Sequence, residues 1–348
     1  MRYLATVLAC IAALCCCAAE SSDAAVETSS ELLNLKVRAR ADWQGDWQHS
    51  EMNDENSGFK GKYLMMRLDG EIIPSLTYSW RQRLSRKIKN GNMFDATDWL
   101  YVRYSVDGWN FSGGKELIAL GGWEYDRNPV DLFCYSVFWQ NTPSFEFGAT
   151  TSYDITPSDN LMFQVTQSMW RREGLNNIYC YNLMWSGNHG ILSTIWSANM
   201  AEYDKGRFIS YLSLGNKIET GQWRLELDLM NRAASHQTFL LRDCSVMGDL
   251  ALLTTCRRWR FHAKMTYDVN RTQTNADLAV LPGTELTMAG GGVEFYPIRQ
   301  KRTSLRLHAA CYHSWGRNTE ESDIMQSGTT LLSVGVSWDM DLLHLRRK

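Results

Sequence analysis

GFKGKYLMMRLDGEIIPSLTYSWRQRL, residues 58–84, carries the clearest indication of the fold in the sequence. In its first half, apolar residues at positions 64, 66, 68 and 72 alternate with a set that contains Arg67, Asp69 and Glu71. After Pro74, aromatic residues at positions 78 and 80 alternate with polar residues at 77, 79, 81 and 83. A period of two means that one face is apolar and the other polar. The stretch therefore predicts two amphipathic β-strands joined by a tight turn.

The same alternation recurs along the chain, in residues 35–43, 223–229, 258–268 and 332–341. Several of these runs reach about nine to eleven residues, the length that a tilted strand needs to cross a bilayer. Strands of soluble proteins are usually shorter, at about five or six residues. The runs therefore favour a membrane barrel over the structural alternative, a secreted β-sandwich.

The links between strands fall into two classes. Short links are expected near residues 73–74, 107–108, 156–159, 187–190, 219–221, 256–257 and 297–301. Longer links are expected near residues 44–61, 86–95, 120–142, 233–244, 270–283 and 316–328, and intermediate ones near 171–176 and 201–206. Short periplasmic turns that alternate with longer outer loops are typical of an up-and-down membrane barrel. Counting in this way predicts an all-β, transmembrane antiparallel barrel of about sixteen strands, to within about two.

Composition is compatible with this fold. The chain has 348 residues, a net charge of −2, 14 Trp and only 6 Pro. The near-neutral charge argues against nucleic acid as a partner. The mean hydropathy of −0.34 does not argue against a barrel, because polar lumen residues cancel apolar lipid-facing ones in an average. The five cysteines after residue 19 lack metal-site spacing, so we expect neither a metal site nor a disulfide framework.

The N-terminal residues have the pattern of a secretory signal peptide. Arg2 precedes an uncharged, mostly apolar run, and Cys17, Ala18 and Ala19 are small residues before Glu20. We expect a signal peptide over residues 1–19, a flexible periplasmic lead-in over 20–32 and the barrel over 33–348. A membrane anchor and a lipoprotein signal at Cys17 are the alternatives. The expected location is the outer membrane of a Gram-negative bacterium.

Residues 33–83 and 112–132 resemble porins of the phosphate-selective O and P family, in its Bacteroidetes form. The resemblance rests on the lysine and arginines at positions 36, 38 and 40, on residues 58–84, and on the segment GGKELIALGGWEYDRNP over residues 113–129. It implies a channel, often trimeric, whose loops fold into the lumen and whose arginines attract anions. The chain departs from the family in two places. It continues past its last strand into residues 345–348, and its candidate constriction loop carries the acids Glu124, Asp126 and Asp131 against Arg127 alone.

The polar face of the strands supplies a set of basic residues in phase with the lumen. The set comprises Lys36, Arg38, Arg40, Arg67, Arg81, Arg83, Arg224, Arg258, Arg260, Lys264 and Arg306. Guanidinium groups along a water-filled pore lower the barrier for phosphate and other anions. Acids such as Asp42, Glu226 and Asp339 share the same phase. A lumen of mixed charge without selectivity is therefore the alternative.

Residues 120–142 form the longest link. A loop of this length without periodicity is usually functional, and folded inward it would narrow the pore. The candidate constriction residues are Trp123, Glu124, Asp126, Arg127 and Asp131. The alternative is an ordinary extracellular loop.

These features predict a passive diffusion channel for small hydrophilic solutes, with a possible preference for anions such as phosphate. We expect no cofactor, no metal and no catalytic activity, because the chain has no phosphate-binding loop, HExxH motif or nucleophile elbow. The expected partners are outer-membrane lipid, small hydrophilic or anionic solutes and further copies of the chain in a homotrimer. A structural or surface-adhesion barrel is the main alternative. A lipid hydrolase, suggested faintly by residues 166–170, is a weaker one.

Overall fold

A computed structural model of the chain describes residues 31–86, 88, 92–237, 242–272, 276–298, 304–319 and 326–346. The expected signal peptide and most of the expected lead-in lie outside the described residues. None of the helices in the described part has the length and apolarity needed to cross a bilayer.

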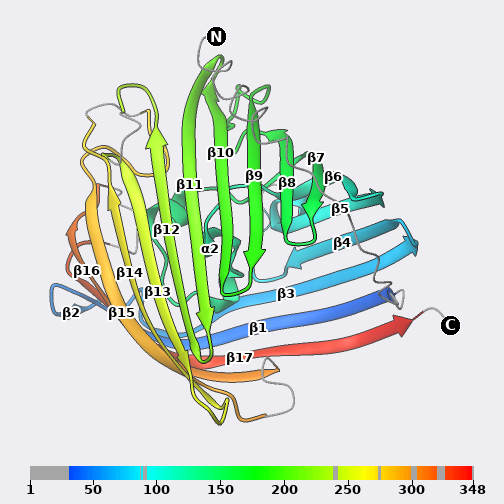
Figure 1. Cartoon of the computed structure of the whole chain (residues 1–348). Coiled ribbons are helices and arrows are strands. Elements are labelled where there is room, and N and C mark those ends of the chain that lie inside the picture. Colours follow the sequence, from blue (N-terminus) through cyan, green and yellow to red (C-terminus); the bar gives the residue numbers. More distant parts are fainter. Residues whose placement is uncertain are drawn as a thin grey trace.

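Seventeen strands form one antiparallel sheet that closes on itself, because β1 (Glu31–Gln48) pairs with both β3 (Gly58–Ile73) and β17 (Thr329–Arg346). The extra strand, β2 (Glu51–Met52), has two residues and pairs with the end of β1. The remaining sixteen strands make the wall, so the predicted strand number is confirmed. Figure 1 shows the closed ring.

The other wall strands follow each other around the ring in chain order. They are β4 (Leu76–Arg83), β5 (Thr97–Val106), β6 (Trp109–Leu117), β7 (Phe145–Thr156), β8 (Asp159–Gln167), β9 (Tyr179–His189), β10 (Leu192–Asp204), β11 (Arg207–Thr220), β12 (Trp223–Ala233), β13 (Cys244–Leu253), β14 (Trp259–Val269), β15 (Glu285–Phe295) and β16 (Leu305–Arg317). Short turns and longer loops alternate between them, except that β10 and β11 meet in a tight turn at Lys205 and Gly206.

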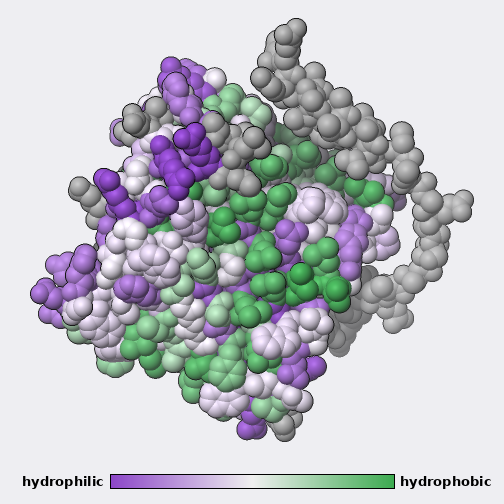
Figure 2. Space-filling view, turned by 60° about the vertical axis from the view of Figure 1, so that its left-hand side comes forward, coloured by the Kyte–Doolittle hydropathy of each residue, from purple (hydrophilic) through white to green (hydrophobic). Residues whose placement is uncertain are grey.

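The strands have one apolar and one polar face, as the alternation predicts. In β5, Leu100, Val102 and Tyr104 are exposed on the outside of the barrel, between residues that face inward. On the inside of β8, β9 and β10, Gln164, Asn182 and Asn199 are almost fully buried. Figure 2 shows hydrophobic side chains gathered over the middle of one outer face, with many hydrophilic ones toward its edges. An apolar exterior around a polar lumen is the arrangement of a barrel surrounded by lipid.

Two irregularities change which residues face the lumen. In the pairing of β1 with β3, Arg40 lies opposite Tyr63 and Ala41 opposite Gly61, so that Lys62 is skipped. In the pairing of β4 with β5, Arg81 lies opposite Trp99 and Gln82 opposite Thr97, so that Asp98 is skipped. A β-bulge of this kind re-aims the side chain of the extra residue.

The first and the last wall strands pair along their full length. Strand β17 continues through Leu345 to Arg346, where it pairs with Glu31. The expectation that residues 345–348 follow the last strand is therefore wrong for Leu345 and Arg346. The pairing gives these residues backbone partners on β1, which an unpaired tail would lack.

Candidate functional site

The lumen is partly filled by the link between β6 and β7, residues 118–144, which we call the inward loop. It contains the helices α2 (Trp123–Asp126) and α3 (Val137–Asn141) and the 3-10 turn η2 (Pro129–Asp131). Figure 1 shows α2 within the ring of strands. Ile118, Val137 and Phe138 are buried against Tyr211 and Met288 of the wall in one apolar cluster. The longest link therefore folds into the barrel. Of the two arrangements expected from the sequence, it has the inward one and is not an ordinary extracellular loop.

A row of neutral amides holds the start of the inward loop. Gln164 of β8 accepts a hydrogen bond from the Ala119 amide at 2.8 Å, and Asn199 of β10 donates to the Ala119 carbonyl at 2.8 Å. Asn182 of β9 lies between the two and bonds both, at 3.1 and 2.9 Å. Each buried amide thus has a partner, and the loop leaves the wall at a defined point.

Two carboxylates of the wall bind the N-termini of the loop helices. Asp228 of β12 accepts from the backbone amides of Trp123 and Glu124, both at 2.8 Å. Asp268 of β14 accepts from the amides of Val137 and Phe138, at 2.9 and 3.2 Å. The first amides of a helix have no intrahelical acceptor, so a carboxylate at this position stabilises the helix end. For α2 the wall supplies the side-chain cap, and for α3 it adds to the Ser136 hydroxyl, which accepts from the Trp139 amide at 3.1 Å.

Ion pairs across the lumen add a second set of contacts. The guanidinium of Arg127 pairs with Asp249 at 2.7 Å and with Glu226. Lys264 pairs with Glu124 at 2.5 Å and also donates to the Cys134 carbonyl at 2.7 Å. Burial alone would lower the pKa of Arg127, but the carboxylates of Glu226 and Asp249 outweigh it and raise that pKa. Arg127 therefore stays charged and bound to the wall.

Opposite these contacts, β1 and β16 bind the centre of the loop. Arg40 donates to the Leu132 carbonyl at 2.6 Å and to the Val130 carbonyl at 3.3 Å. Its guanidinium lies 4.6 Å from the ring centre of Phe133, and Arg306 lies 5.6 Å from it. Because these two arginines bond carbonyls of the loop and contact Phe133, they hold the loop in place.

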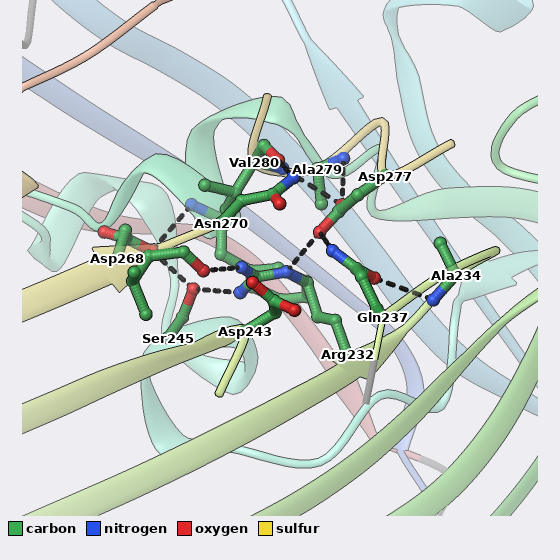
Figure 3. A network of polar contacts seen from close by, with 12 residues as sticks. Arg232, Ala234, Gln237, Asp243, Ser245, Asp268, Asn270, Asp277, Ala279 and Val280 are labelled. Carbon is green, nitrogen blue, oxygen red and sulfur yellow. Dashed lines mark hydrogen bonds and ion pairs between the residues drawn. The ribbon is translucent and has the colours of Figure 1, made fainter. Parts of the chain in front are cut away.

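A second loop, between β14 and β15, is also bonded to the wall. Arg232 of β12 is fully buried and pairs with Asp277 of that loop at 2.7 Å, and it also donates to Ser245. Asp277 in turn accepts from the amides of Ala279 and Val280. Figure 3 shows these groups pointing toward one another, with Asp268 at one side. Since Ser245 also bonds Asp268, the network connects this loop to the cap of α3.

The space that remains beside the loop lies mainly along β3, β4 and β5. This space, which we call the β3–β5 chamber, has a volume of about 780 Å³. Its lining includes six basic residues: Lys62, Arg67, Arg81, Arg83, Arg86 and Arg127. It also includes Tyr63, Trp99, Trp139 and Phe145. On the loop side, Asp126 is the one acid among the described lining residues. Desolvation of Asp126 inside the lumen raises its pKa, an effect that Lys217 opposes and Glu226 reinforces.

A smaller space lies on the other side of residues 127–131. This arginine chamber has a volume of about 190 Å³ and is lined by residues of β1, β12, β14, β16 and β17. Its basic lining residues are Arg38, Arg127, Arg224, Arg260 and Arg306, and its lining acids are Asp131 and Asp339. Since Arg127 lines both spaces, the segment from Arg127 to Asp131 separates one chamber from the other.

The structure places the basic residues predicted for the lumen in five different surroundings. Arg67, Arg81 and Arg83 line the β3–β5 chamber, and Arg38, Arg224, Arg260 and Arg306 line the arginine chamber. Arg40 and Lys264 are buried and bond the loop. Lys36 is half-exposed on β1, 3.8 Å from Asp341. Arg258 lies outside the strands and is exposed in the turn before β14, because that turn extends past Arg257.

The predicted constriction residues also differ in role. Glu124 is buried and accepts from Ser136 and Lys264, so it stabilises the loop internally. Trp123 faces β11, where Lys217 lies 4.1 Å from its ring centre. Asp126 faces the β3–β5 chamber and Asp131 the arginine chamber, where it pairs with Arg306 at 2.8 Å. Arg127 stands between the two chambers.

Sequence reasoning missed several residues of the site. Lys62 and Asp98 are in bulges, where alternation does not assign a face. Arg86 lies in the link after β4, beyond the strand pattern. Asp228 and Asp268 appear in the pattern as inward acids, but nothing local to them shows that they cap helices more than 100 residues away in the chain.

Comparison with known proteins agrees with the barrel. Residues 33–190 match the model of the family described as phosphate-selective porin O and P. No curated protein sequence is similar to the chain at a significant level.

Solved structures with the same architecture include three outer-membrane barrels. An anion-selective porin from Comamonas acidovorans is 10% identical, with a TM-score of 0.63 over 89% of this chain and 100% of that one. OmpT, an outer membrane protein of Vibrio cholerae, is 11% identical, with a TM-score of 0.59 over 90% and 99%. A mutant of Rh. blastica porin is 13% identical, with a TM-score of 0.54 over 89% and 100%. At sequence identities this low, the similarity to these structures establishes the fold alone.

Proposed function

We propose that the chain is a porin of the bacterial outer membrane, which conducts small hydrophilic solutes by passive diffusion and favours anions. The barrel and the family match of residues 33–190 support this proposal. The match supports the phosphate-selective O and P family. We further propose the Bacteroidetes form of that family, on the sequence of residues 58–84 and 113–129.

The observation that carries the anion preference is the charge imbalance of the β3–β5 chamber. Six basic residues line it, and Asp126 is the one acid among the described lining residues. Behind the lining, Asp98 is shared by two guanidiniums, at 2.8 Å from Arg81 and 3.0 Å from Arg83. Arg67 is paired with Asp69 at 2.7 Å, but one carboxylate cannot neutralise both Arg81 and Arg83, so the chamber keeps a positive potential that lowers the barrier for anions.

The arginine chamber continues this potential past residues 127–131. Five arginines line it, against the two acids Asp131 and Asp339. Some of these arginines are ion-paired, as in the 2.8 Å pair of Arg306 with Asp131. Partial neutralisation keeps the affinity low, and a conducting pore needs its solute to leave as easily as it enters.

Single-channel recording in a planar bilayer tests this function. In a KCl gradient, purified protein should give stable steps and a reversal potential biased toward chloride. A reversal potential biased toward potassium would contradict the anion preference. Absence of any step would favour the structural or surface-adhesion barrel instead.

We propose that the protein acts as a channel without catalysis and as a homotrimer. In support of the first, the buried carboxylates Glu124, Asp228 and Asp268 are all engaged in holding the inward loop. In support of the second, one structure of the same architecture, OmpT of Vibrio cholerae, is described as a trimer form. Lipid hydrolysis by pure protein would contradict the first proposal. A monomeric mass in detergent by light scattering would contradict the second.

A further inference from the structure

We propose that the β3–β5 chamber selects flat aromatic carboxylates, in preference to inorganic phosphate and to carboxylates of equal charge without an aromatic ring. The inference rests on the proposed function, since it presupposes a pore that admits anions. It goes further by stating which chemical feature, besides charge, the chamber recognises.

The size of the chamber is the first argument. Its volume of about 780 Å³ lies within the range of about 300–1,000 Å³ that is usual for sites of ring-sized organic ligands. A phosphate ion could contact only one part of such a lining at a time. A carboxylate with a six-membered ring is large enough to contact two parts at once.

The wall of the chamber combines guanidinium groups with aromatic rings. Arg81 Cζ lies 3.7 Å from the ring centre of Trp99 and 5.2 Å from that of Phe145. The Trp99 indole donates to the Ser79 hydroxyl at 2.7 Å, and Arg81 Nε bonds Asp98. These two bonds hold the Trp99 ring and the Arg81 guanidinium in fixed orientations. A solute therefore meets a preformed stack rather than free side chains.

The neighbouring arginines repeat this combination. Arg67 lies 5.3 Å from the ring centre of Trp99, and Arg83 lies 5.8 Å from that of Tyr63. A guanidinium offers a flat face for stacking and an edge of N–H donors for a carboxylate. An aromatic carboxylate can use both on adjacent residues, because its own ring and carboxylate are coplanar or nearly so. An inorganic anion can use only the donor edge.

The charges of the chamber leave donors available for the carboxylate. Asp98 is shared between Arg81 and Arg83, as described above. Lys62 donates to the neutral side-chain amide of Gln44. An added carboxylate thus enters a site with more positive than negative charge.

The loop side of the lining adds a further aromatic ring. It contains Trp139, whose ring is tilted against that of Tyr135 with ring centres 4.8 Å apart. The same side carries the amides of Asn128, Gln140 and Asn141, whose oxygens can accept from a polar solute. The preference for an aromatic solute therefore rests on the rings and guanidinium groups of the lining.

Block of single-channel chloride current tests the inference. The probes are benzoate, cyclohexanecarboxylate, phosphate and glucose 6-phosphate, each added as the sodium salt at constant ionic strength. Benzoate should reduce the current at a concentration about fivefold lower than cyclohexanecarboxylate, the size of effect expected from stacking on a guanidinium. It should also act at a lower concentration than phosphate. Equal block by benzoate and cyclohexanecarboxylate, or stronger block by phosphate or glucose 6-phosphate, would overturn the inference.

Two variants assign the effect to the chamber. Phe145→Leu keeps an apolar side chain but removes a ring beside Arg81, so the preference for benzoate should fall to within about twofold, as expected when stacking is lost. The matched control is Phe163→Leu on β8, whose ring is 47% exposed on the outer face and should leave the preference unchanged. If Phe145→Leu does not fold, Trp139→Leu serves the same purpose. A benzoate preference that survives in the chamber variant would contradict the inference.

The wild-type chloride bias separates the two proposals. If the bias is present but benzoate has no advantage, the substrate class is wrong and the anion channel stands. If the bias itself is absent, the proposed function fails.

Discussion

Lys264 of the barrel wall lies 2.5 Å from Glu124 of the inward loop, with both side chains buried. The two residues are 140 positions apart in the chain, so the pair joins the loop to the far wall of the lumen. A buried ion pair is costly to break, because removal of one partner leaves the other charge uncompensated.

Lys264→Met should therefore loosen the loop. We expect stability to fall by about 3–5 kcal/mol, the usual cost of leaving a buried charge unpaired, and single-channel conductance to become larger and noisier. Heat-modifiability on gels and bilayer recording measure the two effects. Lys36→Met is the control, since its half-exposed pair with Asp341 should contribute at most about 1 kcal/mol. A quiet channel of wild-type conductance in Lys264→Met would contradict the structural role of this pair.

Arg81→Gln should weaken the anion preference. The variant removes a charge from the lining of the β3–β5 chamber and leaves Arg83 to pair with Asp98. The reversal potential in a KCl gradient should move toward zero. Arg258→Gln, in an exposed turn, also removes one positive charge and should leave the reversal potential unchanged. An equal shift in both variants would mean that overall charge, rather than the chamber, sets the preference.

The pH dependence of the anion preference should report Asp126. Because the pKa of Asp126 is raised, its carboxyl gains a proton at a higher pH than an ordinary aspartate as the solution is acidified. The chamber then loses its negative charge, so the chloride bias should increase as pH falls through that raised pKa. Asp126→Asn should show the increased bias at neutral pH and a smaller change on acidification. Identical pH profiles for the two proteins would exclude Asp126 as the cause.

Asp228→Ala should destabilise α2. The substitution removes the acceptor of two backbone amides, at Trp123 and Glu124, and loss of a helix cap typically costs about 0.5–2 kcal/mol. We expect larger current fluctuations in the open channel. Asp228→Asn, which keeps a side-chain oxygen as acceptor, should lie between the wild type and Asp228→Ala. The opposite order would argue against a capping role.

Arg232→Met should destabilise the loop between β14 and β15. Both Arg232 and Asp277 are fully buried, so the substitution leaves an unpaired buried carboxylate, at a cost of about 3–5 kcal/mol. Adding Asp277→Asn removes the unpaired charge and should recover part of the loss. The temperature at which the folded band disappears from an unboiled gel measures both. No recovery in the double variant would mean that the charge is not the cause.

Much of the wall could be predicted from the sequence. Residues that face lipid are apolar and residues that face the water-filled lumen are mostly polar, and the two kinds alternate along each strand. That alternation gives the strand number and places Arg67, Arg81 and Arg83 in the lumen. It fails where local geometry departs from it, as at the Lys62 bulge and at Arg258, where the turn extends by one residue.

The path of the inward loop could not be predicted in the same way. Arg40 and Leu132 are 92 residues apart in the chain, and their contact leaves no periodic trace in the sequence. The length of the link suggests a functional loop, but its direction depends on charges and caps that only the closed barrel brings together.

The capped and ion-paired loop has a practical consequence. Asp228, Asp268 and Lys264 hold the loop without lining the β3–β5 chamber, whereas Arg67 and Phe145 line that chamber. Apart from Arg127, which is ion-paired with the wall and also lines the chamber, the scaffold and the filter are therefore separate parts of one chain. An engineer could redesign the filter for another cargo by exchanging chamber residues alone, and keep the scaffold as it stands.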